Sequence, residues 1–464
     1  MAATPTPTGS PEVNGQDGPS RPEVRRKDHI GWIVAASFAA GLLAALLLAA
    51  APFIAPEENA VTGALLIGFA LGWAMLAVLS ARFTEHPQRW AAVPALFMAV
   101  GGLLLIWFGT SLRELLNWVW PPALLALVVW MVVRARRDLP ARSRRWLLYP
   151  VLALLGLAAI GGGYETVQEA VDANAYPMPG RLIDVGGHRL HLQCTGSGSP
   201  TVVLEPGAGD FSAVMGWISP AVAADTRVCV YDRAGRGWSE PADAPQDGTQ
   251  IASDLHRLLQ RGNVPGPYVL AGHSFGSLYV LTFAARYPDG VAGMVLVDST
   301  NPASQPQPGA SAYDGGSYDV VGRISALGSV AARVGLARLV GNFGYDSLPP
   351  RSRDEVHASS ATANYVDSYI DEYAQGSASV TEAAALTGFG DKPLFVLTAG
   401  VGSDTTHSAS QDHLATLSSN SVHRVIDGAD HPALILEKQY AASTTQAILD
   451  VVASVRSNSQ LGGN

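Results

Sequence analysis

The chain has 464 residues, of which 48% are hydrophobic and only 15% are charged, and its formal net charge is −9. Soluble proteins usually carry about 25% charged residues, so this composition indicates a membrane portion. The negative charge argues against a nucleic-acid partner, because no large basic face remains. The chain has two cysteines and no CxxC motif or Cys/His cluster, so we expect neither a disulfide-dense scaffold nor a metal or other cofactor.

The first third of the chain predicts a tail followed by membrane helices. Residues 1–28 are rich in Pro, Gly, Thr and charge without apolar periodicity, which predicts a disordered tail. A membrane helix needs roughly 20 apolar residues, and the segment from about Ile30 to Ile54 is long enough. A cleaved signal peptide is the alternative for this segment. Similar segments lie near Ala60–Ser80, Ala91–Thr110, Asn117–Val133 and Trp146–Gly163. We therefore predict a transmembrane region of about five helices over residues 29–165.

The charges between these segments predict their orientation. Basic residues precede the first segment and mark the second and fourth loops, whereas the first and third loops have no basic excess. Under the positive-inside rule this pattern places the N-terminus in the cytoplasm. Five spans then place the chain beyond about residue 165 outside the cytoplasm, in a multi-pass protein of the cell membrane. We find no ionisable residue in the middle of a span, which disfavours a transporter and favours an anchoring bundle.

From about residue 181 the pattern changes to strands alternating with helices. A hairpin is predicted where Arg181–Val185 and Leu190–Cys194 flank Gly186-Gly187. Short apolar runs then alternate with helical stretches, which predicts a parallel sheet with helices on both faces. These runs are Thr201–Leu204, Arg227–Tyr231, Tyr268–Ala271, Met294–Val297, Pro393–Thr398 and His423–Ile426. The interval of about 301–390 has helical composition, and insertions of this size tend to form a cap over a site.

Gly272-His273-Ser274-Phe275-Gly276 follows one predicted strand and precedes a helix. A sharp turn in this setting exposes the serine hydroxyl, and glycines two residues either side avoid clashes. The pentapeptide is weak evidence alone, but its strand–turn–helix context predicts that Ser274 is a nucleophile. A plain turn without chemistry is the alternative.

A serine nucleophile needs a base held by an acid, and on such a fold they follow in the order Ser, acid, His. His431 follows the last predicted strand, where the base is expected, whereas His407, His413 and His423 are expected at the solvated surface. Asp404, just beyond the strand Pro393–Thr398, is the preferred acid. Asp298, at the end of the preceding strand, is the alternative, and Asp412 and Asp430 are weaker candidates.

Acyl transfer also needs donors for the oxyanion, usually two backbone N–H groups. Phe275, directly after the nucleophile, is the first candidate. The second is expected from the glycine loop after Thr201–Leu204, where Pro206 has no N–H, so Gly207 or Ala208 is the candidate. A simple glycine turn is the other interpretation of this loop.

With these pieces in order, residues 181–455 resemble the α/β-hydrolase family. The landmarks are the glycine loop at 205–209, the Tyr231–Ser239 turn with its Asp-x-x-Gly-x-Gly-x-Ser pattern, the nucleophile motif and the late His431. The resemblance implies an α/β-hydrolase fold with a helical cap, in a domain over 176–456, preceded by the α-helical transmembrane region. Many family members carry His-Gly where this chain has Glu205-Pro206, which concerns the oxyanion donor.

The family's strand order would make the strands that carry Cys194 and Cys229 neighbours. In an exported domain the two cysteines would then be able to form a disulfide, which we favour over two buried free thiols.

These features favour a membrane-anchored serine hydrolase that cleaves carboxylic esters. Alternatives are other chemistry on the same triad (a peptidase, thioesterase or perhydrolase) or a non-catalytic membrane-tethered binding module. An epoxide hydrolase or dehalogenase would place Asp where this chain has Ser274. The expected partners are the membrane and a small ester or lipid-like substrate, and nothing in the sequence indicates an oligomeric state. Aromatic residues of the predicted cap are candidates to line the pocket: Tyr313, Tyr318, Phe343, Tyr345, Tyr365 and Tyr369.

Overall fold

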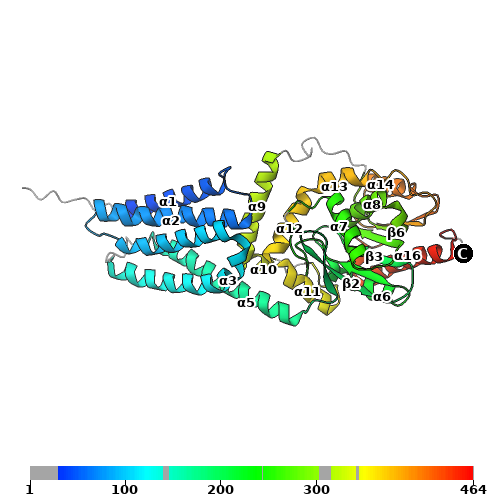
Figure 1. The fold of residues 1–464 in the computed structure, drawn as a ribbon, viewed down its shortest axis with the longest axis horizontal. Coiled ribbons are helices and arrows are strands. Elements are labelled where there is room, and N and C mark those ends of the chain that lie inside the picture. The colour runs from blue at the N-terminus through cyan, green and yellow to red at the C-terminus, as the bar shows by residue number, and fades with distance from the viewer. Residues whose placement is uncertain (1–29, 139–145, 243, 303–314, 341–343, 463–464) are drawn as a thin grey trace, which may run out of the picture.

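A computed structural model of the protein describes residues 30–138, 146–242, 244–302, 315–340 and 344–462. The predicted tail over residues 1–28 lies outside them. A bundle of long helices comes first, and a sheet covered by helices follows, with the C-terminus at the end farthest from the bundle (Figure 1).

The bundle contains five helices that are long and apolar enough to cross a membrane, as the sequence predicted. Gly109, with a φ of 45°, interrupts α3. The third span, Arg89–Gly109, is therefore η1 with the first part of α3, and the fourth, Ser111–Asp138, is the rest of α3. The helices are α1 (Ile30–Ala49), α2 (Glu58–Phe83), η1 (Arg89–Ala91), α3 (Ala92–Asp138) and α5 (Tyr149–Ala175).

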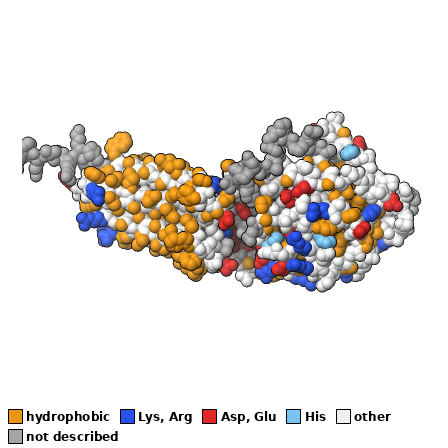
Figure 2. Space-filling model, turned by 45° about the horizontal axis from the view of Figure 1, so that its top comes forward, with side chains coloured by type: hydrophobic (Ala, Val, Ile, Leu, Met, Phe, Trp, Pro, Cys, Tyr) orange, Lys and Arg blue, Asp and Glu red, His pale blue; other side chains and the backbone are white. Residues whose placement is uncertain are grey.

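The outer surface of the bundle is apolar as well as its interior. Trp73 and Met131 are buried, whereas Leu47 and Leu154 are exposed. Figure 2 shows hydrophobic side chains over most of the bundle, with Lys and Arg at the end away from the sheet. A helix that is apolar all round needs an apolar surrounding, and lipid provides it.

Helix α5 is longer than the predicted span, since it continues from Gly163 to Ala175. The additional turns carry Glu165, Glu169 and Asp172. Hydropathy identifies the apolar part of a helix and not its end, so the polar continuation was missed. This extension leads from the bundle to the first strand.

The second part contains an eight-stranded mixed sheet in the order β1-β2-β4-β3-β5-β6-β7-β8. Strands β1 and β2 pair antiparallel, β2 also pairs antiparallel with β4, and the remaining neighbours are parallel. The fold class predicted from the sequence is confirmed. The strands are β1 (Arg181–Asp184), β2 (Arg189–Thr195), β3 (Thr201–Glu205), β4 (Val228–Tyr231), β5 (Tyr268–His273), β6 (Val291–Val297), β7 (Leu394–Ala399) and β8 (Ser421–Ile426).

Helices cover both faces of this sheet and bury a separate apolar core on each. One core contains Leu258 and Leu278 from α7 and α8, and the other contains Val222 and Ile448 from α6 and α16. These helices and the shorter ones between the strands are η2 (Ser212–Met215), α6 (Ile218–Ala223), α7 (Gly248–Arg261), α8 (Phe275–Arg286), η3 (Pro288–Gly290), α14 (Thr405–Ala415), α15 (Ala433–Leu436) and α16 (Lys438–Ser457).

Between β6 and β7 the described chain forms a helical cap. Its helix α9 lies crosswise at the end of the bundle, and α12 lies between α9 and the sheet (Figure 1). The cap helices are α9 (Gly315–Arg333), α10 (Leu336–Val340), α11 (Pro350–Ser360), α12 (Ala363–Ala374) and α13 (Gly376–Ala383).

Three arginines join the cap to the bundle. Arg323 donates to backbone carbonyls just after α1, including that of Ile54 at 2.8 Å. Arg333 pairs with Glu58 at the start of α2 at 2.8 Å. Arg338 pairs with Glu165 and Asp172 on the polar extension of α5 at 2.8 and 2.9 Å. The cap therefore rests directly on the end of the helical bundle.

Candidate active site

Ser274 lies at the sharp turn between β5 and α8. Its backbone has φ 54° and ψ −123°, a conformation that costs free energy and recurs at functional sites. Hydrogen bonds from its N–H to the Val297 carbonyl (3.0 Å) and from the Thr300 N–H to its own carbonyl (3.3 Å) hold it against the end of β6. This is the strand–turn–helix context that the motif predicted.

The glycines on either side of Ser274 occupy places that have no room for a side chain. A Cβ atom on Gly272 would lie 2.6 Å from the carbonyl oxygen of Gly276. One on Gly276 would lie 2.5 Å from the carbonyl oxygens of both Glu205 and Pro206. The spacing of the motif is therefore set by the close approach of α8 to the loop after β3.

His431 lies at the same edge of the sheet as Ser274, where the parallel strands have their carboxyl ends. Its ring is 4.6 Å, centroid to centroid, from that of His273, the residue before the nucleophile. Nε2 of His273 donates to the His431 carbonyl at 3.1 Å. Burial lowers the pKa of His273 to about 3, so this ring is neutral and positions the loop that carries His431.

The acid that contacts His431 is Asp298, the alternative of the sequence analysis. Nδ1 of His431 donates to Oδ2 of Asp298 at 2.5 Å. Burial alone would raise the pKa of Asp298, but hydrogen bonds from His431, the Ala399 N–H and His407 lower it to about 2. Asp298 is therefore ionised over the ordinary pH range and is able to fix the orientation of the His431 ring.

The preferred acid, Asp404, does not contact His431 in this structure. Its carboxylate caps helix α14 by accepting the His407 N–H at 2.7 Å. The weaker candidates are also engaged elsewhere: Asp430 accepts the Ala433 N–H at the start of α15, and Asp412 pairs with His423 at 2.8 Å.

His407 has a place that the sequence analysis did not anticipate. Expected at the solvated surface, it instead directs Nε2 to Oδ1 of Asp298 at 2.8 Å. Asp298 therefore lies between two imidazoles, those of His407 and His431. The sequence does contain a signal for this position of His407, which is the Asp404-x-x-His407 spacing. An aspartate at the N-cap of a helix places the residue three positions later in the first turn of that helix. His423 also has partners, Thr398 and Asp412, whereas His413 is exposed.

The loop after β3 supplies the candidate oxyanion donors. A Cβ on Gly207 would lie 3.3 Å from Cβ of Ser274, so the loop passes directly beside the nucleophile. Gly209 donates its N–H to Glu372, and Asp210 donates its N–H to the Gly207 carbonyl. Because Pro206 has no N–H, Gly207 and Ala208 remain as the donors from this loop. Phe275 is the first residue of α8, where backbone N–H groups have no partner within the helix.

A buried cluster of charges holds this loop in place. Arg233, from the turn after β4, donates to the carbonyls of Pro206 (2.9 Å) and Gly207 (2.6 Å) and pairs with Glu205 at 2.6 Å. It also pairs with Glu372 of α12 at 2.8 Å. At the position where the sequence analysis noted Glu205-Pro206 in place of His-Gly, the salt bridge between Glu205 and Arg233 therefore anchors the loop. The sequence analysis used the turn after β4 as a landmark of the family resemblance and assigned no role to its arginine.

Glu372 connects the cap to the same cluster. Besides Arg233 and the Gly209 N–H, it pairs with Arg236 at 2.6 Å and accepts the Tyr279 hydroxyl at 2.8 Å. Burial would raise the pKa of Glu372, but the two arginines lower it, so its carboxylate stays charged. A single buried glutamate therefore joins α12 to the loop beside Ser274.

Tyrosines of the cap surround the loop beside Ser274. Tyr345 donates to Asp210 at 3.1 Å, and Tyr369 lies against Gly209. Tyr365 stacks on Tyr369 with ring centroids 6.1 Å apart. Burial raises the pKa of Asp210 to about 6, despite its Tyr345 partner. Of the other predicted aromatic residues, Tyr313 and Phe343 lie outside the described residues.

Cys194 and Cys229 face each other on neighbouring strands. They are directly paired in the antiparallel register of β2 and β4, with Cα atoms 4.0 Å apart, and the structure joins them in a disulfide. The bridge ties the edge hairpin to the strand whose following turn carries Arg233.

Sequence comparisons find partial relatives of this chain. An uncharacterized protein of Schizosaccharomyces pombe is 34% identical over 155 residues, which are 27% of this chain and 29% of that protein. A 2-(acetamidomethylene)succinate hydrolase of Mesorhizobium japonicum is 30% identical over 120 residues, 26% of this chain and 42% of that protein. The matches thus cover less than half the length of either relative.

Among solved structures, a thermophilic esterase from Thermogutta terrifontis is similar, with 20% identity and a TM-score of 0.44 over 58% of this chain and 94% of that one. Residues 200–438, about half of the chain, match the family profile described as the alpha/beta hydrolase fold. This interval contains the nucleophile motif, both histidines that contact Asp298, and the loop beside Ser274. The chain belongs to the α/β-hydrolase family.

Proposed function

We propose that this protein is a serine hydrolase that cleaves carboxylic esters, with Ser274, His431 and Asp298 as its triad. The observation that carries the proposal is the Asp298–His431 hydrogen bond beside a serine in the strained conformation of a nucleophile elbow. An ionised carboxylate on Nδ1 leaves Nε2 of the imidazole to act as the base.

In the proposed reaction, Nε2 of His431 takes the proton of the Ser274 hydroxyl as the serine oxygen attacks the ester carbonyl. The N–H groups of Phe275 and of Gly207 or Ala208 stabilise the negative charge on the carbonyl oxygen. His431 then gives the proton to the leaving alcohol, which leaves an acyl group on Ser274. Water, activated by the same imidazole, releases the carboxylic acid and restores the serine.

The position of the cap supports a lipophilic substrate. Val320, Ile324 and Leu327 recur along α9 at the spacing of one helical face and are exposed, as are Leu339 and Val340 at the end of α10. The three arginines hold this surface at the end of the membrane helices. Exposed apolar side chains at the end of a membrane bundle are suited to contact with the lipid interface. A lipophilic ester would enter the site at Ser274 from this interface.

A graded series of p-nitrophenyl esters tests this proposal on the full chain. We expect turnover that rises with acyl chain length and is abolished in Ser274→Ala. Ser457→Ala, at an exposed position at the end of α16, is the matched control and is expected to keep activity. Ester turnover that persists in Ser274→Ala, or none in the unaltered protein, would reject the proposal.

We also propose that the hydrolase part lies on the extracytoplasmic side of the cell membrane. The described basic residues Arg82, Arg89, Arg134, Arg136 and Arg137 lie at or near span ends. Figure 2 shows Lys and Arg side chains at the end of the bundle away from the sheet. Basic residues favour the cytoplasmic side. Alkaline phosphatase fused after residue 464 is then expected to be active. Green fluorescent protein fused at the same position is expected to be non-fluorescent. The opposite pair of readings would place this part in the cytoplasm.

A further inference from the structure

A second cavity, separate from the site at Ser274, lies within the helical bundle. Its volume is about 330 Å³, within the size range of ligand pockets. Helices α2, α3 and α5 supply most of its lining, including Leu66, Trp120 and Leu155, and Val330 of the cap helix α9 contributes to it. The cavity is therefore an apolar space inside the membrane region, bounded on one side by the cap.

One end of this cavity is charged. Arg113 pairs with Glu58, and Arg333 pairs with the same glutamate at 2.8 Å. Among the described residues that line the cavity, the charged ones are Arg113, Arg333 and Glu58, so two positive charges face one negative charge. Glu58 accepts from the Nε and Nη2 groups of Arg333, which leaves its Nη1 group for a further acceptor. An anion at this end would balance the charge.

A carboxylate of the cap, that of Asp367, does not supply this anion. Asp367 interacts electrostatically with Arg113 but accepts a hydrogen bond from Ser325 and does not line the cavity. Burial also raises the pKa of Asp367. The wall of this cavity therefore carries two arginines and one carboxylate, and Glu169, which interacts electrostatically with Arg333, lines the polar cavity on the other side of Arg333.

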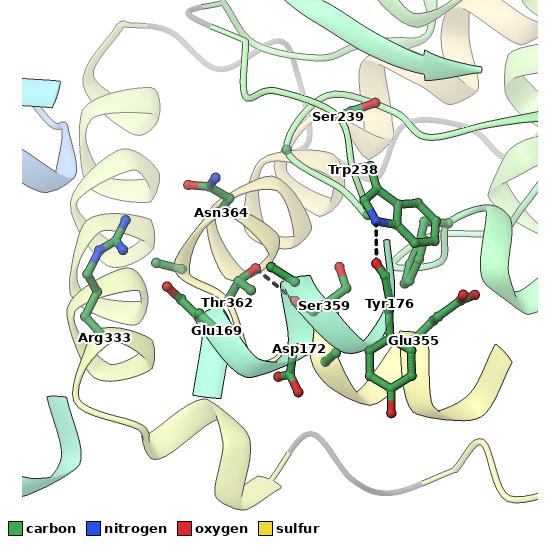
Figure 3. A pocket seen from close by; sticks show the side chains of 16 residues that line it. Glu169, Asp172, Tyr176, Trp238, Ser239, Arg333, Glu355, Ser359, Thr362 and Asn364 are labelled. Carbon is green, nitrogen blue, oxygen red and sulfur yellow. Dashed lines mark hydrogen bonds between the residues drawn. The ribbon is translucent and has the colours of Figure 1, made fainter. Parts of the chain in front are cut away.

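Arg333 also lines a polar cavity of about 290 Å³ on its other side. Figure 3 shows Arg333 and Glu169 at one end of this polar cavity, with Tyr176, Trp238 and Glu355 at the other. With Asp172, the polar cavity has three carboxylates. These would repel a large or multiply charged head group that extended past Arg333, so the site favours a compact, singly charged anion.

We propose that the bundle cavity binds a long-chain fatty acid. The aliphatic chain lies along Leu66, Trp120 and Leu155, and the carboxylate lies against Arg333 and Arg113. Apolar contact provides affinity for the chain, and a charge-assisted hydrogen bond to a guanidinium orients the head. Because Arg333 and Val330 belong to α9, the bound molecule contacts both the bundle and the cap. This inference does not depend on catalysis at Ser274.

Photolabelling of the full chain in nanodiscs tests the site. The probe is a fatty acid with a diazirine in its chain and a terminal alkyne, used on the Ser274→Ala protein so that no acyl transfer interferes. We expect saturable labelling of peptides from α2, α3 and α5. Unlabelled fatty acid should compete about tenfold better than the fatty alcohol of equal length, which corresponds to roughly 1.4 kcal/mol. Equal competition by acid and alcohol, or labelling that does not saturate, would overturn the proposal.

Two variants locate the binding. Ala158→Phe places a ring in the cavity, whereas Ala153→Phe adds the same ring to the lipid-facing side of the same helix. We expect labelling to fall about tenfold in the first and to stay unchanged in the second. Arg333→Gln, outside the spans, should remove the preference for acid over alcohol. Equal labelling of the two phenylalanine variants, or a preference that persists in Arg333→Gln, would contradict the assignment. The comparison of acid with alcohol on the parent chain needs no variant to fold.

Discussion

Oδ2 of Asp298 lies 2.5 Å from Nδ1 of His431. The pKa of this carboxyl is lowered to about 2, because three hydrogen bonds outweigh the effect of burial. The acid therefore stays ionised wherever the enzyme is assayed. An acid limb in the pH–rate profile above about pH 4 would then not report protonation of Asp298.

The identity of the acid is tested by two matched substitutions. Asp298→Asn keeps the size of the side chain but removes the charge, and we expect kcat to fall about 10⁴-fold because His431 loses its productive tautomer. Asp404→Asn should change kcat little, since asparagine also caps helices well. Both values come from steady-state turnover of one ester. A large loss in Asp404→Asn with near-normal Asp298→Asn would reverse the assignment.

His407 is expected to tune the triad without reacting itself. In His407→Ala, Asp298 loses a hydrogen-bond donor, so its carboxylate stabilises the imidazolium form of His431 more strongly. The acid limb of kcat/KM should therefore move to higher pH, while kcat falls by less than about tenfold, or roughly 1.4 kcal/mol. Asp298, His407 and His431 line one cavity, and the other charged groups that line it, Asp404 and Asp430, are unchanged. His413 is exposed on the same helix, so His413→Ala is the control. An acid limb of kcat/KM that stays in place or moves to lower pH in His407→Ala would contradict this role of His407.

Glu372 is expected to be needed for both stability and rate. Glu372→Gln leaves Arg233 and Arg236 buried with one carboxylate fewer, and removal of one partner from a buried pair costs about 3–5 kcal/mol. The loop beside Ser274 should also loosen, which lowers kcat. Thermal unfolding and turnover measure the two effects. Glu240→Gln, which weakens the solvent-exposed pair with Arg189, should cost less than about 1 kcal/mol, and an equal cost for both would argue against the anchor.

The disulfide is expected to stabilise the hydrolase part. It joins residues 35 apart, and a closed loop of this length corresponds to about 4 kcal/mol in the chain-entropy model. Replacement of both Cys194 and Cys229 by alanine should lower the free energy of unfolding by up to that amount, measured by denaturant titration. Native protein from membranes in which maleimide labels both thiols would show that the bridge does not form.

The fold and the nucleophile motif were readable from the sequence because their signals are local. Gly272 and Gly276 stand where a Cβ would strike backbone, so the motif reports the packing directly. Apolar segments of sufficient length likewise predicted the five membrane helices. The end of α5 was missed because its last turns are polar and owe their position to Arg338 of the cap.

The acid was harder to predict, because Asp298 and Asp404 both follow strands whose carboxyl ends meet at one edge of the sheet. The choice depends on side-chain direction, which a backbone conformation with φ 44° sets at Asp298. It depends as well on helix α14, which uses Asp404 as its N-cap. The Arg233–Glu372 pair has no local signal, since its residues are far apart in the chain.

The central claim is that Ser274 is the nucleophile of the Asp298–His431 pair. The most direct measurement is reaction of the full chain with a fluorophosphonate probe, followed by peptide mapping of the adduct by mass spectrometry. The account predicts one adduct, on Ser274, that forms far more slowly in His431→Ala. An adduct on another residue, or labelling of Ser274 at an unchanged rate in His431→Ala, would contradict it.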